Sequence, residues 1–202
     1  MRVIAGTHRG RQLRAPAGSA TRPTADRVRE AVFDILQSLV DLEGARVLDL
    51  FAGSGAMGIE ALSRGAAAAV FVEHDRRALR ALRDNLAAMG LEGPARVVHA
   101  EAVAWLSGRR PAAQASFDVA ICDPPYRFEG WNALLDSLDA EVAVLESSRP
   151  VDPGRGWEVS RSKRYGGTLV TVVRRAPSAP SVANAPHGRA GPELTPEEKG
   201  TA

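Results

Sequence analysis

Residues 117–126, Phe-Asp-Val-Ala-Ile-Cys-Asp-Pro-Pro-Tyr, end in a carboxylate, two prolines and an aromatic ring. The apolar run before Asp123 has strand character, and Pro124 ends the strand because proline has no N–H to donate to a sheet. Pro125 restricts Pro124 to an extended conformation. We therefore predict a rigid turn that presents Asp123, the Pro124 carbonyl and Tyr126 at the carboxyl end of a strand, where open α/β sheets bind ligands. Alone, the stretch fits an ordinary strand and proline loop equally well.

A glycine-rich loop supplies a second candidate site. Residues 53–58, Gly-Ser-Gly-Ala-Met-Gly, match the G-x-G-x-x-G pattern between a predicted strand at 45–51 and a predicted helix at 56–64. Glycines permit a tight turn and let a ligand approach backbone N–H groups at a helix N-terminus. Glu73 lies twenty residues after Gly53 at the end of the next strand, where an acid accepts hydrogen bonds from ribose hydroxyls. The pattern predicts a nucleoside site.

Asp49 indicates which nucleoside. It lies inside the first strand, four residues before Gly53. A carboxylate aimed at a pyrophosphate is unfavourable, whereas a ligand with a cationic amino-acid end favours one. S-adenosylmethionine has an ammonium, a sulfonium and a ribose but no phosphate, so Asp49 favours it over a nicotinamide dinucleotide. Two alternatives stay open: Asp49 caps a neighbouring helix, and Glu73 is a solvated strand end.

Glu101-Ala102, at the end of a third strand, could contact the adenine edge of the cofactor. The predicted cofactor-binding residues are Asp49, Phe51, Ala52, Gly53, Ser54, Gly55, Glu73, His74, Glu101 and Ala102.

Alternating strands and helices position these residues. Strands are predicted at 45–51, 69–73, 95–99, 119–122 and 141–146, and helices at 56–64, 75–89, 102–106 and 131–138. This alternation implies an α/β, Rossmann-like fold: a mostly parallel, doubly wound sheet with right-handed crossovers. Strands at 157–164 and 168–174 add an antiparallel edge hairpin and bring the sheet to seven strands. No full helix fits between the fifth strand and this hairpin.

The N-terminal residues are basic. Residues 1–30 hold seven arginines against two acids, a net charge of +5, whereas the whole chain has +2. A basic segment indicates an anionic partner, most often nucleic acid. Residues 2–14 predict a small hairpin with Arg9-Gly10-Arg11 at its tip.

A helix follows this hairpin, with Thr24 or Asp26 as its cap, and Arg27 and Arg29 fall off its apolar stripe. The alternative for these arginines is a solvated helix face. The predicted RNA-binding residues are Arg9, Arg11, Arg22, Thr24, Arg27 and Arg29.

Three regions are expected: a basic extension at 1–40, a catalytic domain at 41–175 and a proline-rich tail at 176–202, which we predict to be disordered. The single cysteine, Cys122, excludes an intrachain disulfide and argues for a reducing compartment. No apolar run approaches the roughly 20 residues of a membrane span, and the N-terminus lacks a signal sequence. We expect a cytoplasmic monomer without a metal site.

Two motifs bring these features together. Residues 48–55, Leu-Asp-Leu-Phe-Ala-Gly-Ser-Gly, and 123–126, Asp-Pro-Pro-Tyr, resemble the first and fourth motifs of class I amino-methyltransferases. Residues 22–30, Arg-Pro-Thr-Ala-Asp-Arg-Val-Arg-Glu, and 165–168, Tyr-Gly-Gly-Thr, narrow the resemblance to the bacterial 16S ribosomal RNA guanine-N2 methyltransferases that modify guanine 966 of the small subunit. The resemblance covers about residues 1–175.

The resemblance implies a class I methyltransferase fold, S-adenosylmethionine as donor with S-adenosylhomocysteine as product, and 16S rRNA within the small subunit or its assembly intermediate as substrate. Asp123 and the Pro124 carbonyl would accept hydrogen bonds from the guanine amine and aim its lone pair at the methyl group, and Tyr126 would stack on the base.

Several alternatives remain: an N6-adenine DNA or RNA methyltransferase, a protein-glutamine methyltransferase, a non-catalytic RNA-binding assembly factor, and a nicotinamide oxidoreductase. The basic N-terminus argues against a protein substrate, and Asp49 argues against nicotinamide.

Overall fold

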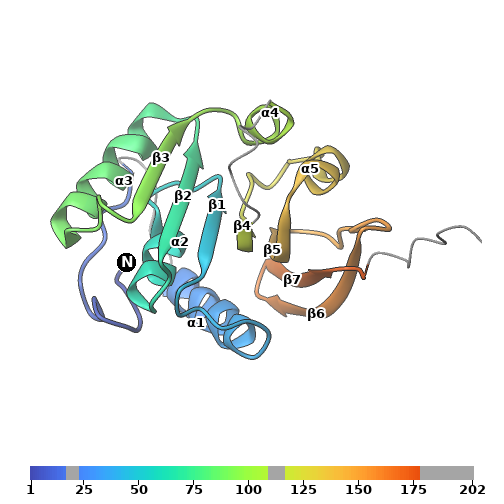
Figure 1. Ribbon diagram of the computed structural model, residues 1–202, viewed down its shortest axis with the longest axis horizontal. Helices are drawn as coiled ribbons and strands as arrows, with labels where there is room; N and C mark the ends of the chain where they lie inside the picture. The colour runs from blue at the N-terminus through green and yellow to red at the C-terminus, as the bar shows by residue number, and fades with distance from the viewer. Residues whose placement is uncertain (17–22, 109–116, 178–202) are drawn as a thin grey trace, which may run out of the picture.

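The computed structural model describes residues 1–16, 23–108 and 117–177. Its seven-stranded sheet has the order β3-β2-β1-β4-β5-β7-β6 (Figure 1). The strands are β1 (Arg46–Leu50), β2 (Ala68–Glu73), β3 (Ala95–His99), β4 (Phe117–Cys122), β5 (Ala140–Ser147), β6 (Trp157–Tyr165) and β7 (Thr168–Arg175). The helices are α1 (Pro23–Gln37), α2 (Ala56–Ser63), α3 (Arg76–Met89), α4 (Ala102–Ser107) and α5 (Trp131–Ser137).

The first five strands are parallel, and β7 pairs antiparallel with both β5 and β6. This arrangement confirms the predicted α/β fold with its antiparallel edge hairpin. The segment between β5 and β6 contains no helix, as its length predicted. At the far edge of the sheet, the side chains of β6 between Trp157 and Tyr165 are exposed.

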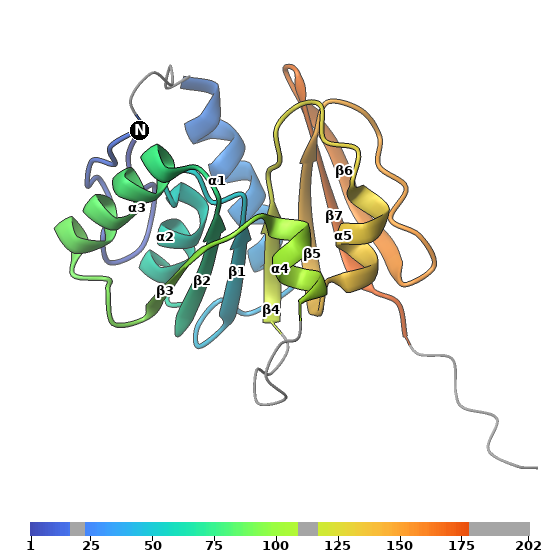
Figure 2. The same ribbon diagram turned by 90° about the horizontal axis from the view of Figure 1, so that it is seen from above.

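Two hydrophobic cores cover the two faces of the sheet. Along β1, Val47 contributes to one core and Leu48 to the other, because successive strand residues point to opposite faces. The first core packs α1, α2 and α3 against the sheet, and the second packs α4 and α5 (Figure 2). Burial on both faces explains the continuous apolar runs at 119–122 in β4 and 142–145 in β5.

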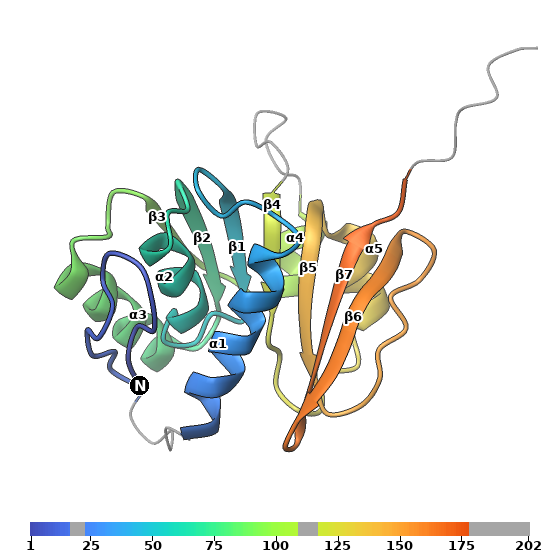
Figure 3. The ribbon, with the colours of Figure 1, turned by 90° about the horizontal axis from the view of Figure 1, so that it is seen from below.

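Helix α1 lies across the first face beside β1 and β4 (Figure 3). It begins at Pro23, whose missing N–H costs nothing in a first helical turn. Thr24 and Asp26 therefore lie inside the helix, and the expectation that one of them is the N-cap is wrong.

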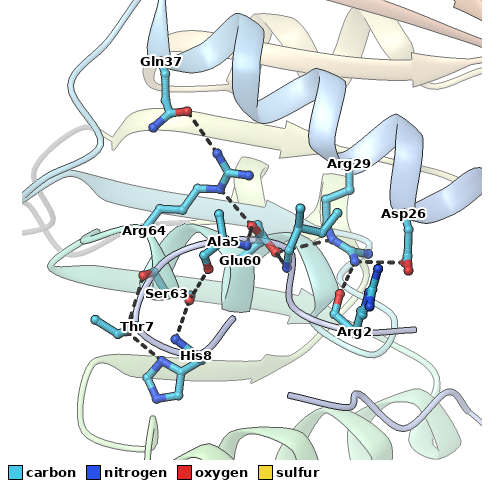
Figure 4. A network of polar contacts seen from close by, with 11 residues as sticks. Arg2, Ala5, Thr7, His8, Asp26, Arg29, Gln37, Glu60, Ser63 and Arg64 are labelled. Carbon is cyan, nitrogen blue, oxygen red and sulfur yellow. Dashed lines mark hydrogen bonds and ion pairs between the residues drawn. The ribbon is translucent and has the colours of Figure 1, made fainter. Parts of the chain in front are cut away.

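The N-terminal residues form a small hairpin, as predicted, with a bridge between Arg2 and Gln12. A buried carboxylate fixes it to α2: Glu60 accepts hydrogen bonds from the backbone N–H groups of Ile4, at 2.8 Å, and Ala5, at 3.0 Å (Figure 4). Gly6 lies so close to α2 that a Cβ atom there would be 1.7 Å from the Ser63 carbonyl oxygen. The hairpin and α2 thus form one packed unit.

Among the described residues, no helix is long and apolar enough to cross a membrane. The predicted tail lies outside the described residues from position 178 onward.

Candidate active site

The Asp-Pro-Pro-Tyr turn begins where β4 ends at Cys122. Pro124 is buried, whereas Asp123 faces open space and Tyr126 is 63% exposed, which is unusual for a large ring. The Pro125 carbonyl accepts a hydrogen bond from the N–H of Phe128 at 2.9 Å, which closes the turn. Asp123 and Tyr126 border a cleft of about 750 Å³. The turn therefore presents an acceptor and a ring to a space large enough for a nucleotide.

The glycine loop borders the same cleft through Ser54, Ala56 and Met57. Gly53 has a φ of 57°, and a Cβ atom there would have open space around it, apart from the Phe51 carbonyl oxygen at 3.9 Å. At Gly55, in contrast, a Cβ atom would lie 2.2 Å from Leu82. Gly53 thus leaves room for a ligand, whereas Gly55 lets α2 and α3 pack closely, a role that the motif alone did not indicate.

Phe51 connects the glycine loop to the segment that follows the Asp-Pro-Pro-Tyr turn. Its φ of 60° is rare for a residue with a side chain, and such strain concentrates at functional sites. Its ring packs edge-on against Phe128, with 5.2 Å between the ring centroids, and Phe128 packs in the same way against Trp131, with 5.3 Å between the centroids. Ala52, next in the chain, is buried and donates its N–H to the Val72 carbonyl at 3.1 Å.

Asp49 is buried beneath the loop, and its Oδ2 accepts the backbone N–H of Gly58 at 2.8 Å. Gly58 is the third residue of α2, so the helix-capping alternative describes a real contact. Burial is the main cause that raises the pKa of Asp49 to about 8; the Gly58 hydrogen bond opposes this rise, and the negative charges of Asp123 and Glu73 add to it. A cation bound at this end of the sheet would relieve that cost.

Glu73, at the end of β2, is buried and holds the loop from the other side. Its Oε2 accepts the N–H of Gly53 at 2.8 Å, and its Oε1 accepts those of His74 and Asp75, each at 2.7 Å. The alternative of a solvated strand end is wrong. The exposed His74 ring places Nδ1 3.3 Å from the same carboxylate.

Glu101 and Ala102 lie at the junction of β3 and α4. Glu101 caps α4, because its carboxylate accepts the N–H groups of Val103 at 3.1 Å and Ala104 at 2.7 Å. Ala102 is buried. These two residues, with Glu73 and His74, lie outside the cleft that Asp123 borders, at the carboxyl ends of the strands beyond β1.

Glu146 belongs to the cleft, and the sequence interpretation gave it no role. It lies near the end of β5, where Leu145 is the register partner of Cys122 in β4, so Glu146 and Asp123 occupy equivalent positions on neighbouring strands. Desolvation by the cleft walls raises the pKa of Asp123 to about 6 and that of Glu146 to about 8. An acid that closes a fifth parallel strand was the available signal, because such strand ends meet at one edge.

The predicted RNA-binding arginines separate into different environments. Arg9, Arg11 and Arg27 are exposed. Arg29 is only 2% exposed, so the alternative of a solvated helix face is wrong for this residue. Its guanidinium donates to Asp26 Oδ1 at 3.0 Å and to the Arg2 carbonyl, and its Nε lies 3.6 Å from Glu60. Arg29 therefore holds the N-terminal hairpin in place and is not free to bind phosphate.

Two further residues, Arg22 and Thr24, are also predicted to bind RNA. Arg22 lies outside the described residues, and Thr24 lies in the first turn of α1.

The walls of the cleft also include the Tyr165-Gly166-Gly167-Thr168 turn of the final hairpin and the segment after Glu146.

The acids of the site fit a cationic ligand. Asp49 is buried, Glu146 is half-buried and Asp123 opens into the cleft, and their negative charges repel one another. In the described part of the chain, none of the three has a hydrogen bond or ion pair to a cationic side chain. Such a set matches a ligand that carries positive charge without phosphate. Within the same part of the chain, no group of three or more His, Cys, Asp or Glu side chains is placed to hold a metal ion.

A seven-stranded sheet of this order, with a glycine loop after β1, an acid at the end of β2 and an Asp-Pro-Pro-Tyr turn after β4, defines a class I methyltransferase fold. The chain belongs to the family described as Conserved hypothetical protein 95, whose model matches residues 1–174. This is the family of ribosomal RNA small subunit methyltransferase D, which confirms the resemblance seen in the motifs.

Similar proteins cover nearly the whole chain. Ribosomal RNA small subunit methyltransferase D of Escherichia coli (strain K12) is 36% identical in an alignment 189 residues long that covers 87% of this chain and 90% of that protein. Its namesake from Haemophilus influenzae is 38% identical over 176 residues, 82% and 89% of the two chains. The solved structure of a putative methyltransferase from Escherichia coli has a TM-score of 0.75 and 35% identity, covering 87% of this chain and 97% of that one.

Proposed function

We propose that the protein methylates the exocyclic N2 of a guanine in 16S rRNA, with S-adenosylmethionine as the methyl donor. The observation that carries this proposal is that Asp123 and Tyr126 lie together in a cleft that the glycine loop also borders. Relatives named as small subunit rRNA methyltransferases support the substrate class. The chemistry of the turn supports the amine as the acceptor.

The cofactor would lie over the loop at the carboxyl ends of β1, β2 and β3. Asp49 would face its cationic end, Glu73 the ribose and Glu101-Ala102 the adenine, with Phe51 to Gly55 forming the floor. When bound, the cofactor supplies an electrophilic methyl group on its sulfonium. Gly53 is the position in the loop with free space above its Cα, which suits the close approach of a ligand to the backbone.

The turn would prepare the amine. The lone pair of a guanine amine is delocalised into the ring, so the nitrogen is a poor nucleophile. Hydrogen bonds from its N–H groups to the Asp123 carboxylate and the Pro124 carbonyl would favour a pyramidal nitrogen and fix the direction of its lone pair. Positioning of this kind supplies much of the rate enhancement in a transfer between two bound groups. No separate base is required, because the nitrogen becomes acidic once it is methylated.

The substrate base would leave its helix to reach the turn. Extrusion costs a few kcal/mol, and stacking on an aromatic ring returns about 1–3 kcal/mol. Tyr126 is exposed at the mouth of the cleft and can provide that stacking. Arg9 and Arg11 at the hairpin tip and Arg27 on α1 are exposed cations for phosphate contacts, which hold RNA without reading its sequence. The extension at 1–40 is thus the proposed RNA-binding part of the chain.

The test is nucleoside analysis of 16S rRNA from cells with and without the gene. We expect one N2-methylguanosine per 16S rRNA to disappear without the protein and to return with the purified enzyme, S-adenosylmethionine and undermethylated small subunits. Label in N6-methyladenosine or in protein would overturn the proposal. Asp123→Ala should abolish transfer while S-adenosylmethionine still binds, which separates a catalytic role from a structural one.

A further inference from the structure

We infer that Glu146 selects guanine by accepting a hydrogen bond from its ring N1–H, while Asp123 accepts one from the neighbouring amine. This inference rests on the proposed function and specifies how its site chooses a base. The two residues together would present a pair of acceptors to a pair of donors.

Strand register places the two carboxylates side by side. Asp49 in β1, Ile121 in β4 and Val144 in β5 are register partners, so side chains two positions later point to the same face. Those positions hold Asp123 and Glu146, and adjacent strands lie about 4.8 Å apart. Both residues line the same cleft, and the charge of Asp123 raises the pKa of Glu146. The spacing suits two adjacent atoms of a single base.

Neither carboxylate has a hydrogen-bond or ion-pair partner among the residues that the structure describes. Asp49 and Glu73 accept backbone N–H groups, but among the described residues none donates a hydrogen bond to Asp123 or Glu146. The charge of Arg29 lowers the pKa of Glu146, yet its guanidinium is held by Asp26, the Arg2 carbonyl and Glu60. A half-buried carboxylate without a partner is costly unless a ligand supplies the donor.

The donor pattern of the base then decides selectivity. Guanine presents N1–H and the N2 amine as neighbouring donors. Adenine presents its N6 amine beside an N1 that accepts, so Glu146 would face a lone pair. A site built to hydrogen-bond an N–H discriminates strongly against an analogue that lacks it, because its own buried group is left unpaired. Asp123 alone offers one acceptor, which either amine satisfies.

The experiment uses 2-aminopurine, which keeps the amine at C2 but has an acceptor at N1. Small subunits are reconstituted from 16S rRNA with guanine or 2-aminopurine at the target position, and kcat/KM is measured for each. We expect the wild-type enzyme to prefer guanine by at least about tenfold. Glu146→Gln can donate its amide N–H to the N1 of 2-aminopurine, so its preference should shrink by about tenfold or reverse.

The ratio of the two substrates isolates the effect, since the loss of O6 in 2-aminopurine affects every variant equally. Glu129→Gln, an exposed acid elsewhere on the cleft, is the control and should keep the wild-type ratio. Glu146→Ala removes the acceptor without adding a donor and should reduce the preference for guanine over 2-aminopurine. This variant replaces Glu146→Gln in the experiment if the Gln variant misfolds.

The outcomes separate the two proposals. A wild-type enzyme that methylates guanine, combined with an unchanged ratio in a folded Glu146 variant, overturns the role of Glu146 and leaves the proposed function intact. Failure of the wild-type enzyme to methylate guanine overturns both.

Discussion

The Oδ2 atom of Asp49 accepts the backbone N–H of Gly58, nine residues later, at 2.8 Å. This contact ties the end of β1 to the first turn of α2 and places beneath the glycine loop a carboxylate that no cationic side chain of the described residues pairs with. The same residue thus supports the loop and carries a charge that the folded protein tolerates poorly. Stability and cofactor binding therefore make opposite demands on it.

Asp49→Asn should separate these demands. The amide oxygen can still accept the Gly58 N–H, but the charge is gone, so S-adenosylmethionine affinity should fall at least about tenfold, equivalent to about 1.4 kcal/mol. The raised pKa of about 8 means that the folded protein binds more protons than the unfolded chain between pH 4 and 8. Wild-type stability thus decreases as pH rises through that range, and the Asn variant should be more stable at pH 8 by on the order of 1–3 kcal/mol.

Denaturant unfolding at pH 5 and 8 and calorimetric titration check this prediction. Asp118→Asn is the matched control: its Oδ2 also accepts a backbone N–H, from Arg46 at 2.6 Å, but at the opposite end of the sheet. It should bind S-adenosylmethionine normally. Equal affinity in Asp49→Asn and wild type would contradict the assignment.

Tyr126→Ala should reduce methylation by about 5- to 150-fold, the loss expected for one stacking contact of 1–3 kcal/mol. Because the ring is 63% exposed, the melting temperature should change little. Tyr126→Phe keeps the stacking face and should retain most activity. Single-turnover rates on small subunits test both, and equal losses in Ala and Phe would assign the effect to the hydroxyl.

Glu60→Ala should destabilise the fold by about 3–5 kcal/mol, since it removes the buried carboxylate that pairs with both Arg29 and Arg64. Hydrogen exchange at Ile4 and Ala5 should rise, because their N–H groups lose their acceptor. Asp84→Asn, which breaks an exposed pair with Arg14 at 3.7 Å, should cost less than about 1 kcal/mol. Unchanged exchange at Ile4 would contradict the anchoring role of Glu60.

Arg9→Ala combined with Arg11→Ala should weaken binding to small subunits and lower the slope of log affinity against log salt by about two, one for each lost phosphate contact. Arg83→Ala, on the exposed side of α3, is the control and should leave the slope unchanged. The affinity of each variant for small subunits is measured between about 50 and 200 mM salt. Equal slopes in all variants would mean that the RNA binds a surface other than the hairpin tip.

Methylation should accelerate as pH rises from 5 to 8. Desolvation raises the pKa of Asp123 to about 6 and that of Glu146 to about 8, so acid protonates both acceptors. The two groups share one cleft, and the apparent pKa belongs to the pair. Glu146→Gln removes a negative charge beside Asp123, so the rise of the methylation rate should shift to lower pH. A pH-independent rate of transfer would contradict acceptance by these carboxylates.

The order of strands and helices could be predicted because several elements end at a residue with a clear local signal. Pro124 prevents β4 from continuing, Gly90 caps the end of α3, and the apolar run at 119–122 requires cover on both faces of the sheet. Asp123 and Asp49 stood out for the same reason: a charged side chain next to a buried strand needs an explanation.

Arg29 and Glu146 could not be read this way. Arg29 lies off the apolar stripe of α1, but the N-terminal hairpin covers that side and supplies the Arg2 carbonyl, while α2 supplies Glu60. Glu146 ends a predicted strand, but the sequence does not show that the register of β4 with β5 sets it beside Asp123. Both depend on contacts between residues far apart in the sequence.

The edge-on stack of Phe51, Phe128 and Trp131 has an optical consequence. Trp131 borders the cleft and packs against Phe128, which in turn packs against Phe51, the residue with positive φ just before the glycine loop. Its indole is therefore a built-in fluorophore for events at that loop, and Trp131→Phe removes the signal while Trp105 and Trp157 stay as background. We expect the fluorescence of Trp131 to follow the proposed binding of S-adenosylmethionine in a stopped-flow instrument, without any attached label.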